Sequence, residues 1–372
     1  MGKRLMRKKY MDNIRWITVV LVVLYHVVYM FNNCGVLGGI GPLAQTQYQD
    51  VLLYVLYPWF MLLLFVVSGM SARLYLDRHS HREFVKARTV KLLVPSTIGL
   101  FVFWWILGYY NMRIGGAMES MGAVPAPIRY LIMAVSGIGP LWYIQMLWFF
   151  SVLLVGFRKI EKDRLYGLCK RTPVLVLILL TPVIWGASLI LNTPLVLVYR
   201  FGIYGVGFLL GYLILLQDEV MDRLEKWWLP LLVAAAVLAV WFTASYYGQN
   251  YAGHEVLDTP LCNGYAWIAT LAALAVMKRW GDRENNFSAW MTQKSWGLYL
   301  FHYLPLAMAS CYLYPVQMPA FCKYLCVAVA AFGGAFVLYE VVSRIPVLRW
   351  CVCGISGGRR KGQTERDAKS GN

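Results

Sequence analysis

Two residues of the first long apolar segment, Arg15 and His26, could do chemistry inside a membrane. They are eleven residues apart. At about 100° per residue both therefore lie on one face of a helix, about 16 Å apart along its axis. Arg15 would lie at one membrane edge, where Asp12 can pair with it, and His26 slightly past the midplane. The alternatives are an Arg15 that reaches the lipid headgroups and a His26 that makes a single structural hydrogen bond.

Two further ionisable residues fall at membrane depth, His302 in the ninth apolar segment and Glu340 in the tenth. A buried ionisable side chain costs at least a few kcal/mol, so each is a candidate functional residue. Two histidines at similar depth on different helices indicate a shared polar cavity. They also leave bis-histidine haem ligation open. Glu340 would orient a histidine or pair with an arginine.

A second cluster of polar residues, Arg88 and Lys91, lies at the mouth of the third apolar segment. The two are i,i+3 neighbours on one helix face. A bidentate arginine beside a lysine suits a phosphate-bearing ligand. The alternative is a pair of cations that anchors the helix at the membrane surface.

The elements that position these residues are predicted to be membrane helices, because 59% of the chain is hydrophobic and only 14% is charged. Globular proteins average about 45–50% hydrophobic residues and about 25% charged residues. Crossing a bilayer takes about 20 apolar residues. About ten segments meet this need, which predicts an all-α polytopic membrane protein; they run near 14–31, 51–71, 92–110, 141–157, 173–191, 199–216, 228–246, 261–277, 296–313 and 324–343.

The net charge of +17 fits this topology better than nucleic-acid binding. When the 35 Lys and Arg are assigned to sides, all but four fall on one side, the exceptions being Arg113, Arg129, Arg200 and Lys323. Cationic loops stay in the cytoplasm, so both termini are predicted to be cytoplasmic and the number of spans even.

One domain is expected over residues 1–353, followed by a basic tail at 354–372 that is predicted to be disordered. The tail contains Gly354-Ile-Ser356-Gly-Gly358, a G-x-S-x-G pattern that we discount because no strand–turn–helix surrounds it. Eight cysteines show neither C-x-x-C pairs nor a Cys/His cluster, so no metal site is expected.

Five motifs in order give the chain a resemblance to the membrane acyltransferase-3 family, over residues 10 to about 350. The first motif is an Arg and a His with ten residues between them, and Arg15 and His26 match it. The others are F-x-x-S-G at 65–69, F-x-x-x-R-x-x-R-L-x-x-P at 84–95, L-W-F/Y at 141–143 and S-x-x-I/L-Y-L-x-H ending at His302. One departure is that Lys91 stands where the family has its second arginine.

The resemblance implies an enzyme of the plasma membrane that moves an acyl group from cytosolic acyl-CoA, such as acetyl-CoA or succinyl-CoA, to a hydroxyl across the membrane. The single-domain branch it is similar to includes glucan-modifying succinyltransferases, so the implied acceptor is a carbohydrate or a lipid-linked glycan. His26 would be the general base or carry the acyl group transiently, Arg15, Arg88 and Lys91 would hold the CoA phosphates, and His302 and Glu340 would assist.

The competing hypothesis is a transporter or exporter of a small polar solute, with the same polar cavity as its path. The sequence names neither the acyl group nor the acceptor, and it leaves the oligomeric state open.

Overall fold

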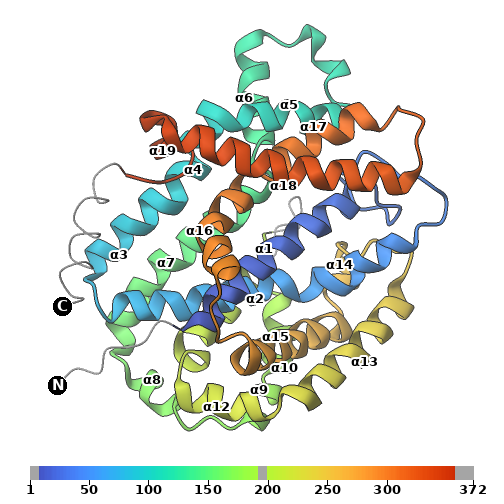
Figure 1. Ribbon diagram of the computed structural model, residues 1–372. Helices are drawn as coiled ribbons and strands as arrows, with labels where there is room; N and C mark the ends of the chain where they lie inside the picture. Colours follow the sequence, from blue (N-terminus) through green and yellow to red (C-terminus); the bar gives the residue numbers. More distant parts are fainter. Residues whose placement is uncertain (1–7, 192–198, 357–372) are drawn as a thin grey trace.

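The computed structural model describes residues 8–191 and 199–356, and every regular element in these ranges is a helix (Figure 1). The α-helices are α1 (Lys9–Tyr29), α2 (Val51–Leu76), α3 (His81–Arg88), α4 (Val94–Ser96), α5 (Trp105–Ile114), α6 (Ala126–Ser136), α7 (Trp142–Glu161), α8 (Arg164–Cys169), α9 (Val174–Leu179), α10 (Thr181–Ser188), α11 (Phe201–Leu210), α12 (Asp218–Lys226), α13 (Trp228–Tyr246), α14 (His254–Leu257), α15 (Pro260–Trp280), α16 (Asn286–Phe301), α17 (Tyr303–Leu313), α18 (Ala320–Arg344) and α19 (Pro346–Cys351). Turns of π-helix follow α3, precede α5 and follow α11, at Thr89–Leu93, Leu100–Trp104 and Gly211–Leu215.

Seven helices of the described ranges are long and apolar enough to cross a membrane, so the predicted count of about ten is not confirmed. They are Lys9–Tyr29, Tyr48–Leu76, His81–Ile114, Gly139–Glu161, Trp228–Tyr246, Pro260–Trp280 and Ala320–Arg344. An eighth follows if Phe201–Leu215 and Asp218–Lys226, which are bent by 99° at their junction, form one span.

Two of the ten predicted spans are interrupted at prolines. Pro182 cannot donate to the carbonyl of Ile178, which instead accepts from the Thr181 hydroxyl at 2.7 Å, and the helix divides into α9 and α10. In the same way Pro305 leaves the carbonyl of Phe301 without its helical donor, and α16 ends at Phe301. Hydropathy alone does not register these breaks.

Exposed apolar surface supports a membrane setting for the long helices. On α13, Val237 is 61% and Val240 71% exposed, and on α18 Val329 is 64% exposed. In water such faces would be unfavourable, whereas lipid tails solvate them.

Helices α1 and α2 lie at the centre of the molecule, with α18 across one side and α13 at the edge (Figure 1). Glycines allow α2 and α11 to cross closely. A Cβ on Gly69 would lie 1.9 Å from the carbonyl oxygen of Phe208, and one on Gly211 2.0 Å from that of Val66. The Gly207-x-x-x-Gly211 pattern is therefore a packing motif.

Residues 1–7 and most of the predicted tail, 357–372, lie outside the described residues. The cytoplasmic location of both termini and the single domain at 1–353 stay predictions.

Candidate active site

The two histidines, which were predicted to share a polar cavity, lie in direct contact, although His302 is fully buried and does not line the cavity described below. His302 Nε2 is 3.3 Å from His26 Nδ1, and the two ring centroids are 5.1 Å apart. His26 is in the last two turns of α1, while His302 occupies the break between α16 and α17. The interruption at Pro305 thus leaves His302 at a helix junction, fully buried.

The hydrogen bonds of this pair determine where its protons lie. His302 Nδ1 is 3.1 Å from the carbonyl oxygen of Leu298 and 2.8 Å from that of Tyr299, so it must carry a proton. In the neutral ring Nε2 is then an acceptor, and the donor facing it is His26 Nδ1–H, which also reaches the Val22 carbonyl at 2.8 Å. His26 Nε2 therefore holds a lone pair, as a general base requires.

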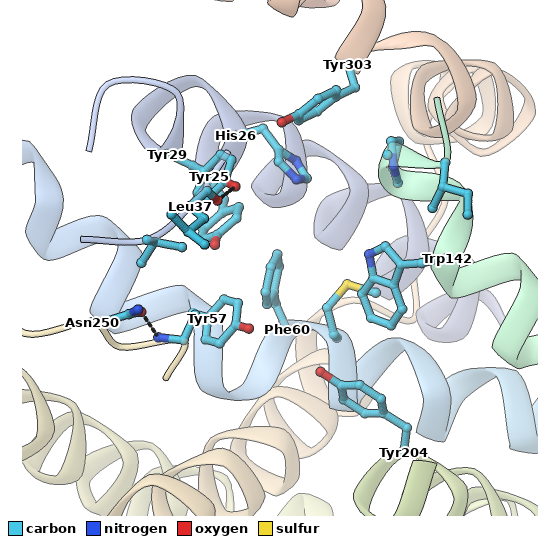
Figure 2. A pocket seen from close by; sticks show the side chains of 16 residues that line it. Tyr25, His26, Tyr29, Leu37, Tyr57, Phe60, Trp142, Tyr204, Asn250 and Tyr303 are labelled. Carbon is cyan, nitrogen blue, oxygen red and sulfur yellow. Dashed lines mark hydrogen bonds between the residues drawn. The ribbon is translucent and has the colours of Figure 1, made fainter. Parts of the chain in front are cut away.

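His26 lies in the wall of a cavity of about 400 Å³, into which its ring points (Figure 2). Figure 2 shows Tyr303 on one side of the ring and Phe60 on the other, with Trp142 and Tyr204 farther along the cavity. Tyrosines dominate this wall, and the residues that line it include no Asp, Glu, Lys or Arg. We call this space the histidine cavity.

Residues of the loop after α13 close one end of the histidine cavity, where Asn250 and Ala252 line it. Between them Tyr251 is buried, and its hydroxyl is 2.9 Å from that of Tyr25. Burial raises the pKa of the Tyr251 hydroxyl well above its usual range, because the phenolate would be desolvated. This end of the cavity is therefore uncharged.

Two of the sequence motifs meet beside the histidines. The Ser68 hydroxyl is 2.8 Å from that of Tyr143, and the Phe65 and Tyr143 rings are 4.8 Å apart. The Tyr143 ring is in turn 5.7 Å from that of Tyr299, whose backbone carbonyl accepts from His302. The motifs at 65–69 and 141–143 thus pack against the element that carries His302.

The cations Arg88 and Lys91 line a second pocket, of about 760 Å³, which we call the cation pocket. Lys86 also lines it, so three positive side chains share this space with one carboxylate, that of Glu83. Among the described residues, no carboxylate forms an ion pair with Arg88 or Lys91; the Arg88 guanidinium lies 5.1 Å from the Phe84 ring centre and the Lys91 ammonium 4.0 Å from that of Trp296. Such a pocket is suited to an anionic ligand.

The C-terminal segment forms part of the same wall. Gly354 and Ser356 line the cation pocket, and Gly354 has a φ of +64°, which favours glycine. A Cβ there would lie 2.7 Å from the carbonyl oxygens of Val90 and Lys91. Gly354, the first residue of the discounted G-x-S-x-G pattern, is therefore in close contact with the π-helical turn that carries Lys91.

Arg15 pairs with Asp12 at 2.7 Å, as predicted, and also donates to the Ser71 hydroxyl of α2. It is near enough to Arg88 and to Tyr143 to act on both electrostatically. It is not among the residues that line either space.

Glu340 is placed apart from the histidines. Its carboxylate is 3.1 Å from Lys294 Nζ and 2.8 Å from an Arg344 guanidinium nitrogen, and its side chain is 47% exposed. Of the two predicted roles, the structure has Glu340 pairing with an arginine.

The contact between the histidines bears on the haem hypothesis. An iron ligated by both rings needs each nitrogen about 2 Å away on opposite sides of it, as in other metal–imidazole bonds. Nitrogens that are 3.3 Å apart and bonded to one another leave no room for a haem between the rings. Within the described ranges, no group of three or more His, Cys, Asp or Glu side chains is placed to hold a metal ion.

Sequence reasoning missed most of the histidine cavity. The available signal was local, because Tyr25, Tyr29 and Tyr303 lie within three residues of His26 or His302. By contrast, no sequence spacing relates Asn250 to α1, since a loop about 220 residues away brings it there.

Comparison with known proteins places the chain in a family. Residues 8–340 match the family described as "Acyltransferase domain", the acyltransferase-3 family. "Glucans biosynthesis protein C" of Shigella boydii serotype 4 (strain Sb227) is 20% identical over 371 residues, which cover 94% of each chain. The protein of the same name from Escherichia coli (strain K12) has the same identity and coverage. No solved structure matches the chain.

The family match spans most of the chain and includes Arg15, His26, His302, Arg88 and Lys91. Together with the membrane-length helices, it identifies a multi-pass membrane protein. The chain belongs to the acyltransferase-3 family.

Proposed function

We propose that this protein is an O-acyltransferase of the plasma membrane that moves an acyl group from cytosolic acyl-CoA to a hydroxyl of a carbohydrate, free or lipid-linked, outside the cytoplasm. The observation that carries the proposal is the lone pair on His26 Nε2, in a ring that points into the histidine cavity.

The chemistry follows from that lone pair. The acceptor hydroxyl attacks the thioester carbonyl while His26 Nε2 takes its proton, and the tetrahedral intermediate then expels the CoA sulfur. His26 returns the proton to the departing thiolate, so the products are an ester and free CoA. As His26 becomes cationic, its Nδ1–H bond to His302 becomes charge-assisted and stabilises the new charge.

The cation pocket is the proposed site for the CoA phosphates. Phosphate oxygens accept hydrogen bonds from guanidinium and ammonium groups, and Lys86, Arg88 and Lys91 supply three such groups in one pocket. Lys91 offers a point charge where the family has an arginine, so we expect it to add attraction without the bidentate geometry. Arg15 acts electrostatically on Arg88, but its own charge is paired with Asp12 and it does not line the pocket.

The histidine cavity is the proposed site for the acceptor. Its aromatic walls suit the apolar faces of a sugar ring, while its tyrosine hydroxyls and Asn250 offer hydrogen bonds. "Glucans biosynthesis protein C", to which the chain is similar, supports a glucan as the class of acceptor.

The experiment that tests the proposal measures CoA release and ester formation by purified protein in proteoliposomes, with acyl-CoA and a glucan on opposite sides. His26→Ala should lower kcat by about 10²- to 10⁴-fold, the usual contribution of a general base. His81→Ala at the start of α3 is the matched control, since His81 lines neither the histidine cavity nor the cation pocket.

Full activity in a folded His26→Ala protein would contradict the proposed base. Movement of a solute across the vesicle membrane without release of CoA would contradict the enzyme itself and favour the transporter.

A further inference from the structure

Trp296 contacts two parts of the wall of the cation pocket, although it does not line the pocket itself. The Lys91 ammonium lies 4.0 Å from the centre of the Trp296 ring. The indole N–H of Trp296 donates to the carbonyl oxygen of Cys353 at 3.0 Å. One side chain of α16 therefore holds both a cation of the pocket and the residue that precedes Gly354 in its wall.

The C-terminal segment, residues 351–356, is folded onto the turn that carries Lys91. Helix α19 packs beside α4, which directly follows that turn (Figure 1). Past the end of α19, the backbone N–H of Gly354 donates to the Trp350 carbonyl at 3.1 Å, and the positive φ of Gly354 brings the chain against the Lys91 carbonyl. The family match ends at residue 340, so this segment lies beyond it.

These contacts form a closed triangle of three chain segments. Lys91 lies on the π-helical turn after α3, Trp296 on α16, and Cys353 and Gly354 on the C-terminal segment. Each of the three segments contacts the other two. Loss of the Trp296 side chain would release the Lys91 ammonium and the Cys353 carbonyl together, so the shape of this wall depends on Trp296.

An aromatic ring holds an ammonium group without neutralising it, because the attraction comes from the ring quadrupole. The N–H donors of Lys91 that point away from the ring stay available to a ligand. The one carboxylate that lines the pocket, that of Glu83, accepts from the backbone N–H and the hydroxyl of Ser80 at 2.9 Å each and caps α3. The contact with Trp296 therefore fixes the position of the Lys91 ammonium and leaves its charge uncompensated, as the binding of a phosphate group requires.

We propose that Trp296 is a positioning residue for a phosphate group bound in the cation pocket, and that the C-terminal segment it holds is a wall of that binding site. This inference rests on the proposed function, which assigns the pocket to the CoA phosphates, and deepens it. It adds one residue at an unspecified position of the motif that ends at His302, and one segment beyond the family match. Trp296 acts through Lys91, while Ser356 brings a hydroxyl to the pocket that can donate to a phosphate oxygen.

The test measures the Kd of CoA and of inorganic pyrophosphate by calorimetry, with variants that separate the two contacts of Trp296. Trp296→Phe keeps a ring for Lys91 and loses the N–H, so both Kd values should rise about threefold, the usual net effect of one hydrogen bond. Trp296→Leu loses both contacts and should raise them about tenfold. Trp290→Phe is the matched control and should change neither value, because Trp290 lies on the same helix, is 43% exposed and does not line the pocket.

A double variant separates the positioning of Lys91 from a purely structural role. In the Lys91→Met protein, Trp296→Leu should raise each Kd only about threefold, the share of the C-terminal segment, because the ammonium is absent. A tenfold effect both with and without Lys91 would overturn the inference. We expect kcat at saturating acyl-CoA to stay within about threefold in each Trp296 variant. The reason is that Tyr299, which stacks on Trp296, still donates to the Pro140 carbonyl.

Gly354→Ala tests the C-terminal segment alone. Its Cβ would lie 2.7 Å from the carbonyl oxygen of Lys91, so the wall must shift, and both Kd values should rise at least about threefold. Gly167→Ala on α8, which has open space, should leave them unchanged. Unchanged Kd values in folded Trp296→Leu or folded Gly354→Ala would overturn the inference. If Trp296→Leu does not fold, Trp296→Phe and Gly354→Ala decide by the same criterion.

The two proposals fail in different ways. If no CoA thioester is consumed, the acyltransferase proposal fails, while a pyrophosphate Kd that rises about tenfold in Trp296→Leu still supports the positioning role. A pyrophosphate Kd that is unchanged in that variant refutes the positioning role whether or not acyl transfer occurs, as does the absence of pyrophosphate binding by the unmodified protein.

Discussion

Replacement of His302 by phenylalanine tests whether His26 is the base and His302 its hydrogen-bond partner. The substitution keeps an aromatic ring of similar size in a fully buried position and removes the acceptor that faces His26 Nδ1. The Leu298 carbonyl keeps the backbone N–H of residue 302 as a donor, whereas the Tyr299 carbonyl loses the imidazole donor that lies 2.8 Å away. A thermal unfolding curve beside the activity therefore separates an effect on His26 from damage at the helix end.

The size of the effect follows from the contacts of His26. In the ground state Val22 still holds the Nδ1 proton at 2.8 Å, so the tautomer of His26 survives. In the transition state His26 is cationic, and a hydrogen bond from a charged donor is worth about 1.5–3 kcal/mol. Removing it should lower kcat by about 10- to 100-fold, at about 1.4 kcal/mol per factor of ten, with both KM values unchanged.

The assay is CoA release under saturating acyl-CoA and acceptor, beside a thermal unfolding curve for each variant. His302→Gln, whose amide oxygen can accept from His26, should recover part of the lost kcat. If His302→Phe were folded and as inactive as His26→Ala, His302 would itself be the base and the proton assignment wrong. An unchanged kcat would equally refute the supporting role.

Three further predictions concern other parts of the molecule. Arg88→Ala should raise KM for acyl-CoA about tenfold, because it removes one charge-assisted contact. KM for the corresponding acyl-pantetheine, which lacks the nucleotide phosphates, should be unchanged. Equal effects on both KM values would contradict a role of Arg88 in binding those phosphates. Gly69→Ala should abolish folded protein, because its Cβ would lie 1.9 Å from the Phe208 carbonyl oxygen, whereas Gly156→Ala, with open space, should be stable by thermal unfolding. Glu340→Gln should keep kcat within about twofold of the unmodified enzyme, because exposed ion pairs contribute little to stability. A large loss of CoA release would instead support the predicted catalytic role of Glu340.

The sequence predicted the residue pairs that depend on local spacing or on shared depth. Asp12 and Arg15 are one helical turn apart and do pair, and His26 and His302 meet as their similar depth in two segments indicated. Arg88 and Lys91 share one pocket, as their i,i+3 spacing suggested. In each case helix periodicity or span position carries the information.

What the sequence did not predict depends on breaks and on distant contacts. Hydropathy treats 173–191 and 296–313 as continuous, although the cyclic side chains of Pro182 and Pro305 remove the hydrogen bonds that would keep them so. Arg200 was assigned only to a side, because no local pattern reveals its contacts with Leu257 and Asn263. The depth of Glu340 in its span indicated burial, yet it lies on an exposed face, which hydropathy does not determine.

The volume of the histidine cavity has a consequence for the product. At about 400 Å³ it is near the lower end of the range of about 300–1,000 Å³ seen for small-ligand cavities. If the acceptor is a glucan, as proposed, the polymer does not fit within such a space and would present one sugar unit at a time. Under the proposed function each transfer would then modify one presented unit, and the spacing of the modified units along the polymer would not be set by the cavity.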